Sequence, residues 1–260
     1  MTTPLPIFQV DAFAEAPFTG NPAAVMPLAE WLPDEVMQAI AAENNLAETA
    51  FLVASEAETH DYDLRWFTPT VEVNLCGHAT LASAHILIPG ERIRFATKSG
   101  ILTVTRDEGL LKLDMPAAPV EPANLPELAK ALGVDAPIFL SREGNGNTIV
   151  LLENQAEVMA VRPDFAALRK LPYLVSVSAP GDRQDVASRV FAAFHGIDED
   201  SVTGSAHCAL APFWAERLGR THFTALQASK RTGILHCELR GDRAILGGHC
   251  VTVIEGHFQI

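Results

Sequence analysis

The 260-residue sequence lacks a surplus of basic residues. Its 19 Lys and Arg residues stand against 32 Asp and Glu residues, a formal net charge of −13 at pH 7. A protein that holds nucleic acid or an anionic membrane surface needs a positively charged face. The composition therefore argues against both kinds of partner. It leaves a small anionic substrate open, because a single site can be positive on an acidic protein.

The sequence also lacks a hydrophobic run long enough to cross a membrane. The longest stretch without a charge or strong polar break lies around residues 79–89, whereas a bilayer span takes about 20 residues. The opening segment, MTTPLPIFQVDAF, has neither the basic region nor the apolar region of a secretory signal. We therefore expect a cytoplasmic protein with no membrane partner.

Cysteine is scarce, and no CxxC motif is present among Cys76, Cys208, Cys237 and Cys250. Two of these thiols directly follow a histidine in strand-like stretches, as His236-Cys237 and His249-Cys250. Neighbouring residues on a strand point to opposite faces, so neither pair can ligate one ion together. We expect reduced thiols and no metal site.

What the sequence does contain is a series of short strands interrupted by helices. Helical spacing predicts helices over 31–44, 75–88, 125–132, 164–171 and 204–218. Alternation and turn residues predict strands over 6–13, 23–26, 49–53, 62–67, 92–95, 100–105, 109–115, 138–140, 148–152, 174–178, 186–194, 226–228, 234–240, 243–246 and 251–254. The segment 75–88 is apolar on nearly every side, which predicts a helix buried all round. The segment 204–218 is a second apolar helix.

The two halves of the chain resemble each other. ATKSGIL at 96–102 matches ASKRTGIL at 228–235, and each follows an apolar helix that opens with glycine and small residues. This repeat predicts an α+β fold of two similar domains, each wrapping strands round a central helix. The proline-rich segment 116–126 predicts the boundary, giving an N-terminal domain over 1–116 and a C-terminal domain over 117–260. A return of the last strand to the first domain is an open alternative.

The two helix openings, GHAT at 77–80 and GSAH at 204–207, predict an anion site. A helix start has free backbone N–H groups and the positive end of the helix dipole, which together bind carboxylates. Two such openings facing each other across a domain cleft would form one site. Small residues also let helices pack closely, and this alternative stays open for each helix alone.

Ionisable residues suited to proton transfer accompany these openings. Glu48 falls where a helix ends and an apolar strand begins, a half-buried position suited to acid–base chemistry, with an exposed loop glutamate as the alternative. Cys76 directly precedes the first central helix, whose dipole predicts a lowered thiol pKa. His78 lies one residue inside that helix, with simple packing as its alternative. Asp200 and Ser201 precede the second helix.

Several segments, taken together, resemble the phenazine-biosynthesis PhzF-like family. They are FTGNPAAV at 18–25, NLAETAF at 45–51, RWFTPTVEVNLCGHAT at 65–80, SRVF at 188–191 and EDSVTGSAH at 199–207. The resemblance implies a diaminopimelate-epimerase-like fold, in which each of two similar domains is a strand barrel round a central helix. It also implies an active site between the domains, a cofactor-independent isomerase activity and a homodimer.

The resemblance implies site residues one by one. The expected catalytic residues are Glu48 as the acid–base glutamate, His78 from the GHAT motif, and Asp200. The residues expected to contact a small carboxylate or amino-acid-like substrate are Cys76, Gly77, Ser201, Gly204 and Ser205. Neither a cofactor nor a metal is expected.

One departure from the family pattern leaves other functions open. The family's EDP motif reads Glu199-Asp200-Ser201 here. In the related epimerases and racemases the positions of Cys76 and Ser201 carry two catalytic cysteines, and this pair is not a thiol pair. The alternatives are an amino-acid racemase, epimerase or dehydratase that uses Cys76 with Ser201 opposite, and a non-catalytic carboxylate-binding module.

Overall fold

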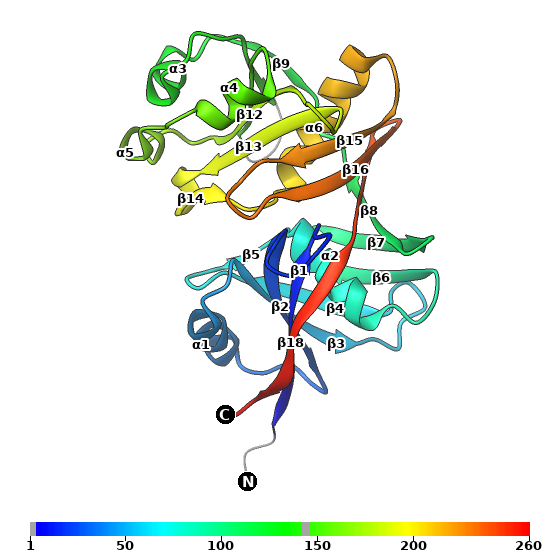
Figure 1. The fold of residues 1–260 in the computed structure, drawn as a ribbon. Coiled ribbons are helices and arrows are strands. Elements are labelled where there is room, and N and C mark those ends of the chain that lie inside the picture. Colours follow the sequence, from blue (N-terminus) through cyan, green and yellow to red (C-terminus); the bar gives the residue numbers. More distant parts are fainter. Residues whose placement is uncertain (1–3, 142–145) are drawn as a thin grey trace. The chain divides into compact units, whose positions relative to one another are not determined.

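The computed structural model describes residues 4–141 and 146–260, and the chain divides into two units (Figure 1). Unit 1 comprises Met1–Asp114 and Gly247–Ile260, and unit 2 comprises Met115–Leu246. The chain first passes from unit 1 to unit 2 between Asp114 and Met115, close to the boundary predicted at residue 116. The last strand of the chain is part of unit 1. No helix in the described part of the chain is long and apolar enough to span a membrane.

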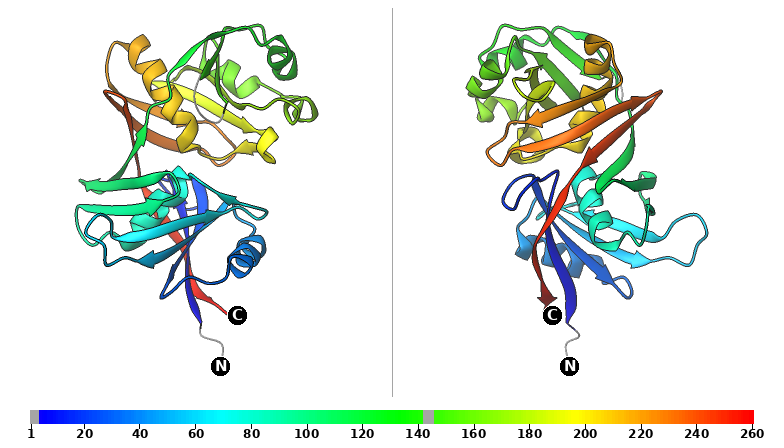
Figure 2. Two further views of the ribbon diagram at one scale, coloured as in Figure 1. Left: turned by 180° about the vertical axis from the view of Figure 1, so that it is seen from behind. Right: turned by 45° about the vertical axis from the view of Figure 1, so that its right-hand side comes forward.

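Unit 1 is a sheet that curves round one helix, with strands in the order β18–β1–β2–β3–β4–β6–β7–β8. The pairs β2/β3 and β4/β6 are parallel and the other neighbours are antiparallel. The strands are β1 (Leu5–Ala12), β2 (Asn21–Leu28), β3 (Glu48–Ala54), β4 (Tyr62–Phe67), β5 (Glu72–Val73), β6 (Arg92–Thr97), β7 (Gly100–Asp107), β8 (Leu110–Pro116) and β18 (Cys250–Phe258). Because β18 pairs with β1, the first and last strands of the chain lie side by side in both views of Figure 2.

The central helix of unit 1, α2 (Gly77–Leu87), is buried because its sequence offers no polar face. Every residue from Gly77 to Ala84 is buried. The hydroxyls of Thr80 and Ser83 donate to the carbonyl groups four residues earlier, at 2.5 and 2.7 Å. Their polar groups are therefore satisfied within the helix. The helix predicted over 75–88 is confirmed, and α1 (Asp34–Asn44) packs on the sheet from outside through Met37 and Ile40.

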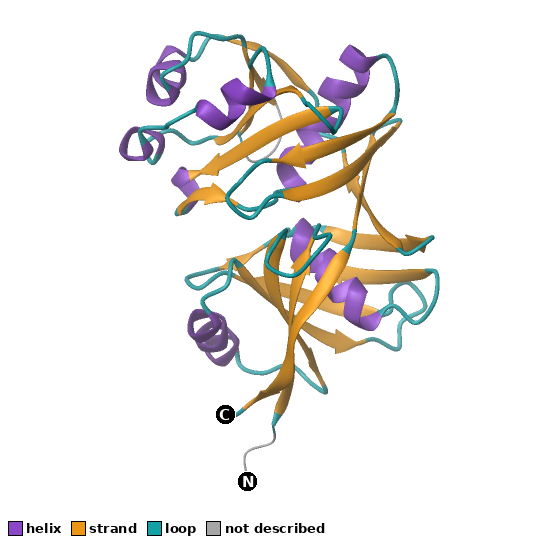
Figure 3. Ribbon diagram, in the orientation of Figure 1, coloured by secondary structure: helices purple, strands orange, loops and turns teal. Residues whose placement is uncertain are grey.

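Unit 2 repeats this topology, with strands in the order β9–β10–β11–β12–β13–β15–β16 and β17 following β16 after a two-residue turn. The parallel pairs are β11/β12 and β13/β15, and β14 pairs with β13 as β5 pairs with β4. The strands are β9 (Val120–Ala123), β10 (Ile138–Ser141), β11 (Asn147–Leu151), β12 (Leu174–Pro180), β13 (Val186–Ala192), β14 (Ile197–Asp200), β15 (His222–Gln227), β16 (Gly233–Arg240) and β17 (Arg243–Gly248). The sheet wraps α6 (Gly204–Leu218), as predicted from the repeat (Figure 3).

The outer face of unit 2 differs from the sequence prediction. It carries α3 (Pro126–Leu132), α4 (Gln155–Ala160), α5 (Phe165–Leu168) and the 3₁₀ turn η1 (Ala193–His195). The helix predicted over 164–171 ends at Leu168, and α4 was not predicted because six residues give little periodicity. Asn154 caps α4 by accepting from the backbone N–H of Glu157 at 3.0 Å.

The proline-rich segment that was predicted as the domain boundary contains a strand. Its residues Val120–Ala123 form β9, which pairs antiparallel with β10. Proline is tolerated on an edge strand, where one side of the backbone needs no ladder hydrogen bond. Pro122 takes such a place opposite Phe139.

The turn between β1 and β2 generates a first prediction, at Gly20. This residue has φ +67°, and a Cβ there would lie 2.2 Å from the carbonyl oxygen of Ala12. Gly20→Ala therefore adds a clash with the backbone to the strain of a left-handed residue. We expect it to lower the free energy of unfolding of the protein by at least about 3 kcal/mol. Chemical denaturation measures the loss.

Gly109→Ala is the matched control for the Gly20 variant. Gly109 has φ +85° in the same unit, and a Cβ there meets nothing within 4 Å. We expect it to cost only about 1 kcal/mol. Equal losses for the two variants would contradict a steric role for Gly20.

Candidate active site

Three of the predicted residues meet at the start of α2 in unit 1. Glu48 is the first residue of β3, Cys76 is the N-cap residue of α2, and His78 is the second residue of that helix. Nε2 of His78 lies 3.1 Å from Oε2 of Glu48, and Nδ1 of His78 lies 3.6 Å from Sγ of Cys76. The imidazole therefore stands between a thiol and a carboxylate, with one of them at each ring nitrogen.

Local structure explains why Glu48 begins its strand here. The helix α1 ends at Asn44, and Asn45 turns the chain in a left-handed conformation with φ 49°. The side chain of Asn44 then donates to the hydroxyl of Thr49 at 3.1 Å, tying the helix end to the strand start. The parallel register of β2 and β3 sets Glu48 opposite Ala23.

The contact between Glu48 and His78 is close but not aligned as a hydrogen bond. Their side chains are 15% and 6% exposed, and among the described residues neither Oε2 of Glu48 nor Nε2 of His78 has a hydrogen-bond partner. Both atoms are therefore buried without a hydrogen bond, which is unusual because buried polar atoms in native proteins usually have a partner. Asn21 sets its amide nitrogen 3.3 Å from the other ring nitrogen, Nδ1.

Burial and charge act in opposite directions on His78. Burial lowers its pKa, but the negative charges available from Cys76 and Glu48 outweigh burial, and the pKa lies well above 6.5. Burial raises the pKa of the Cys76 thiol above 9.0, and the charge of Glu48 acts in the same direction. The predicted lowering of this pKa by the helix dipole is therefore wrong, because the fully buried thiol loses its water.

A two-pronged ion pair fixes the segment that leads into α2. Arg65 on β4 donates from Nε and Nη2 to the two carboxylate oxygens of Glu72 on β5, at 2.8 and 2.9 Å. The guanidinium group also lies 5.2 Å from the centre of the Phe67 ring. Hydrogen bonds from Arg65, and a weaker one from Lys98, lower the pKa of Glu72 to about 2 despite its burial. We call this arrangement an Arg–Glu fork.

Unit 2 contains the same fork before α6. Arg189 on β13 donates to the two oxygens of Glu199 on β14 at 2.7 and 2.9 Å, and its guanidinium lies 5.0 Å from the centre of the Phe191 ring. The first residue of the EDS motif therefore anchors a strand. Asp200 and Ser201 follow it directly, so the fork also sets where they begin.

The loop between β14 and α6 is held by a buried glutamine that the sequence analysis missed. Oε1 of Gln227 accepts from the backbone N–H of Thr203 at 2.8 Å, and Nε2 donates to the carbonyl of Asp200 at 2.9 Å. The hydroxyl of Thr203 donates to Oδ2 of Asp200 at 2.6 Å, and Ser229 donates to the carbonyl of Ser201 at 2.7 Å. A lone polar side chain in the middle of the strand predicted over 226–228 was the available signal.

The helix openings correspond position by position. Thr203 is the N-cap residue of α6, as Cys76 is of α2, so Thr203 and not Ser201 takes the place of Cys76 in the repeat. Gly77, Gly204 and Ser205 begin their helices, where backbone N–H groups have no partner within the helix. Their predicted place at a helix start is thus confirmed.

His207 behaves as a core histidine. It is fully buried, and its Nδ1 lies 2.8 Å from the carbonyl oxygen of Thr203. Burial lowers its pKa to about 4, so the neutral imidazole donates to that carbonyl. His207 thus provides a hydrogen-bond donor for the carbonyl of the residue before α6, as the hydroxyl of Thr80 does for the carbonyl of Cys76 before α2.

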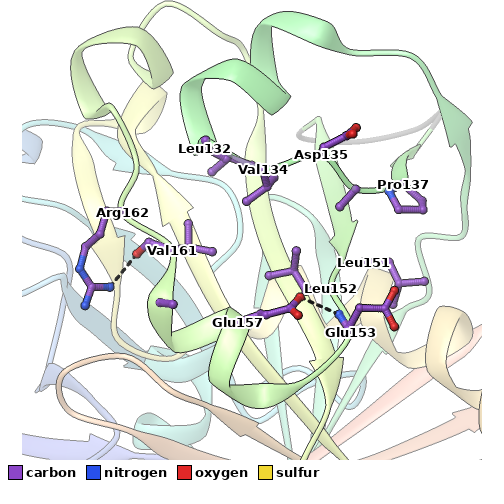
Figure 4. A pocket seen from close by; sticks show the side chains of 13 residues that line it. Leu132, Val134, Asp135, Pro137, Leu151, Leu152, Glu153, Glu157, Val161 and Arg162 are labelled. Carbon is purple, nitrogen blue, oxygen red and sulfur yellow. Dashed lines mark hydrogen bonds between the residues drawn. The ribbon is translucent and has the colours of Figure 1, made fainter.

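Two pockets of unit 2 are lined by none of the predicted site residues. A pocket of about 500 Å³ lies between the end of α3, β11 and α4, and Figure 4 shows the carboxylate of Glu157 turned to the backbone N–H of Glu153. Arg162, on its rim, donates to backbone carbonyls. A second pocket, of about 460 Å³, includes Glu199, Ser229 and Lys230 and so adjoins the loop of Asp200.

Comparison with known proteins places the chain in a family. The family model described as phenazine biosynthesis-like protein matches residues 10–256. The chain belongs to this family. A protein of Pseudomonas aeruginosa described as an uncharacterized isomerase is 49% identical over 98% of this chain and 99% of its own length. The phenazine biosynthesis-like domain-containing protein of Homo sapiens is 36% identical over 97% of this chain and 98% of its own.

Solved structures agree with the fold. A PhzF-family protein of Enterococcus faecalis superposes with a TM-score of 0.93 at 43% identity, over 99% of this chain and 100% of that one. A hydroxyproline epimerase from Agrobacterium vitis, at 12% identity and a TM-score of 0.57 over 99% of this chain and 93% of that one, shares the fold alone. The predicted diaminopimelate-epimerase-like fold is confirmed.

The fork of unit 1 generates a prediction about acid stability. The lowered pKa of Glu72 stabilises the folded state above pH 4.5, and this contribution is lost as pH falls toward 2. We expect Glu72→Gln to cost about 2–3 kcal/mol at pH 7 and almost nothing near pH 2. Urea denaturation across this range measures it, and a loss that does not depend on pH would contradict the assignment. Glu30→Gln, at an exposed position, is the control.

The Glu48–His78 contact generates a prediction about His78. Because the Glu48 charge favours the imidazolium, Glu48→Gln should lower the pKa of His78, which NMR titration of the ring nitrogens measures. A raised folded-state pKa stabilises the fold below about pH 6.5 and loses that contribution as pH rises through the folded value. The variant should therefore lose this contribution at a lower pH. An unchanged pKa would contradict the contact, and exposed Glu43→Gln should leave it unchanged.

Proposed function

We propose that this chain is a cofactor-independent isomerase that moves a proton on a small carboxylate or amino-acid-like substrate, with Glu48 as the general acid and base. Family membership and the epimerase-fold neighbours support an isomerase. The observation that carries the finer proposal is the Glu48–His78 contact. The half-buried Glu48 and the buried His78 lie 3.1 Å apart, and their facing atoms have no hydrogen-bond partner among the described residues.

The proposed reaction begins with the carboxylate form of Glu48. It accepts a proton from a substrate carbon, the C–H bond breaks, and its electron pair spreads into the neighbouring carboxylate or conjugated system. The protonated Glu48 then returns the proton to the same or another carbon, so that no proton is gained or lost overall. Positioned acid–base groups of this kind contribute about 10²–10⁴-fold to rate.

His78 and the helix openings would stabilise the charge that develops. The raised pKa of His78 keeps its imidazole protonated at neutral pH, beside the place where Glu48 takes the proton. The backbone N–H groups at Gly77, at the positive end of the α2 dipole, would stabilise the negative charge that develops on the substrate. For Asp200, Ser201, Gly204 and Ser205 in unit 2 we propose substrate binding and orientation. The location of the bound substrate, the homodimer and the cytoplasmic location stay predictions.

The alternative in which Cys76 is the catalytic base is disfavoured by its surroundings. The thiol is 5% exposed, and burial raises its pKa, so it is protonated at neutral pH. Thiolates are the reactive form, and reactive cysteines have lowered pKa values. Thr203, which takes the place of Cys76 in the repeat, offers a hydroxyl and no second thiol.

Proton exchange with solvent tests the proposal. The protein in deuterated buffer, incubated with amino acids and with cyclic β-hydroxy or unsaturated amino acids, should place deuterium in at least one compound, as NMR detects. We expect Glu48→Gln to slow this exchange by at least about 100-fold, because an amide cannot carry the proton. Exchange that survives Glu48→Gln in a folded protein would overturn the role of Glu48.

Cys76→Ser distinguishes the two enzyme mechanisms in the same assay. The Glu48 mechanism predicts only a small loss, whereas a cysteine-based racemase, epimerase or dehydratase would lose nearly all of its exchange. A carboxylate that raises the melting temperature of the protein but never exchanges would favour the non-catalytic binding module.

A further inference from the structure

The internal repeat includes a pocket beside each Arg–Glu fork. In unit 1, Arg65 of the fork and Lys98 of the ATKSGIL segment line a pocket of about 320 Å³. In unit 2, Arg189 of the fork and Lys230 of the ASKRTGIL segment line a pocket of about 460 Å³. Lys98 and Lys230 are each the third residue of their segment. We call the hollow in unit 2, between the end of α4, the fork and the loop after β15, the fork pocket.

The pocket of unit 1 has its positive charges paired. Nζ of Lys98 lies 2.6 Å from Oε2 of Glu72, the carboxylate that Arg65 also holds. Nη1 of Arg65 donates to Oδ1 of Asp34 at 2.8 Å. Both basic side chains of this pocket therefore have a carboxylate partner, and an anion in the pocket would gain little from them.

The corresponding lysine of unit 2 has no such partner. Both oxygens of Glu199 accept from Arg189, at 2.7 and 2.9 Å, so these two charges balance each other. Lys230 lines the same pocket and is exposed, but it makes neither a hydrogen bond nor an ion pair within residues 4–141 and 146–260. One positive charge of the fork pocket is therefore left uncompensated.

Arg162, which follows α4, adds a second uncompensated charge to the fork pocket. Its Nη1 donates to the backbone carbonyls of Met159 and Val161 at 2.7 and 2.9 Å, which fixes the guanidinium group. Its Nε and Nη2 have no hydrogen-bond partner in the part of the chain that the structure describes. Figure 4 shows the guanidinium well apart from the carboxylates of Glu153 and Glu157.

From these charges we infer that the fork pocket binds a small organic phosphate. A phosphate monoester carries between 1.5 and 2 negative charges at pH 7 and has three strong acceptor oxygens. Two uncompensated cations match that charge, and the free N–H groups of Arg162 match the oxygens, because a guanidinium group binds phosphate through parallel hydrogen bonds. Lys230 would act as a point charge. The volume of about 460 Å³ is typical of small-molecule sites.

The fork pocket also has an apolar wall for the organic part of the ligand. Met159, Pro163 and Phe165 line it, and the side chain of Met159 is 54% exposed. The Phe165 ring packs edge-on against Phe191, with 6.0 Å between the ring centres, so its position is fixed from beneath. A ring or short alkyl group on the phosphate would cover this apolar surface, whereas inorganic phosphate would not.

The fork pocket does not use the residues of the proposed isomerase site. Neither Asp200, Ser201 nor Gly204 lines it. It adjoins their loop through Glu199 and through Ser229, whose hydroxyl donates to the carbonyl of Ser201 at 2.7 Å. The inference is therefore a second site, and it stands whether or not Glu48 is the acid–base residue.

Isothermal titration calorimetry of the full chain with phenyl phosphate, at pH 7.5 and low salt, tests the site. We expect one phenyl phosphate per chain. Benzoate has the same ring with a single negative charge, and we expect it to bind at least about 10-fold more weakly, because one charge leaves one cation uncompensated. Inorganic phosphate should also bind more weakly, since it lacks the ring. Added salt should lower the affinity for phenyl phosphate.

Substitutions locate the binding. Lys230→Gln and Arg162→Gln should each weaken phenyl phosphate binding at least about 10-fold, because each removes a charged partner of the ligand. Lys98→Gln is the matched control from the repeat. It should bind as the native chain does, because Lys98 is already paired with Glu72. Thermal unfolding without ligand shows that each variant is folded.

Three results would overturn the inference. They are no binding of phenyl phosphate to the native chain, equal affinities for phenyl phosphate and benzoate, and binding that Lys230→Gln weakens no more than Lys98→Gln does. Glu48→Gln keeps the two proposals apart. This variant should bind phenyl phosphate as the native chain does, whatever becomes of its proton exchange.

Discussion

The Arg–Glu fork is the interaction on which the placement of both helix openings depends. In each unit an arginine on a long strand holds both oxygens of a glutamate on the short strand beside it, at 2.7–2.9 Å. The helix begins only a few residues after that glutamate. Bidentate arginine–carboxylate pairs fix geometry as well as energy, because two parallel hydrogen bonds define an orientation. The forks thus set where the chain enters α2 and α6, and with them the first N–H groups of each helix.

Burial then shifts the pKa values of the side chains at the two helix openings. The start of α2 is buried on every side, so burial raises the pKa of the Cys76 thiol, while the acidic groups of Cys76 and Glu48 raise the pKa of His78 in spite of its burial. The same burial makes His207 neutral in α6, where no carboxylate faces it. The pKa values of two histidines at related helix openings therefore shift in opposite directions. The difference follows from the neighbours: Cys76 and Glu48 act against burial at His78, whereas at His207 a backbone carbonyl acts against it.

The repeat, both central helices and the three residues at the start of α2 could be predicted from the sequence. These came from strong local signals: apolar runs of helical length and a short, specific motif. The direction of the pKa shift of Cys76 could not be predicted, because a sequence indicates where a helix begins but not how deeply that residue is buried. Nor could β9, where an edge strand tolerates Pro122, or the six-residue helix α4, which is too short to show a period. The forks depend on two short strands, β5 and β14, which the sequence analysis did not predict, and Gln227 contacts residues 24 and 27 positions away in the sequence.

The repeat also shows how one frame holds two different sets of side chains. Cys76 and Thr203 occupy the same N-cap position, and His78 and Ser205 the same second helical position. In unit 2, neutral hydrogen bonds from Gln227 and Ser229 hold the loop that precedes the helix. Unit 1 leaves Glu48 and His78 close but unaligned, with hydrogen-bonding capacity to spare. Buried polar atoms are nearly always satisfied in folded proteins, and Nε2 of His207 in unit 2 also lacks a hydrogen-bond partner among the described residues. What distinguishes unit 1 is that its two unpartnered atoms at the helix opening belong to two ionisable groups that lie 3.1 Å apart.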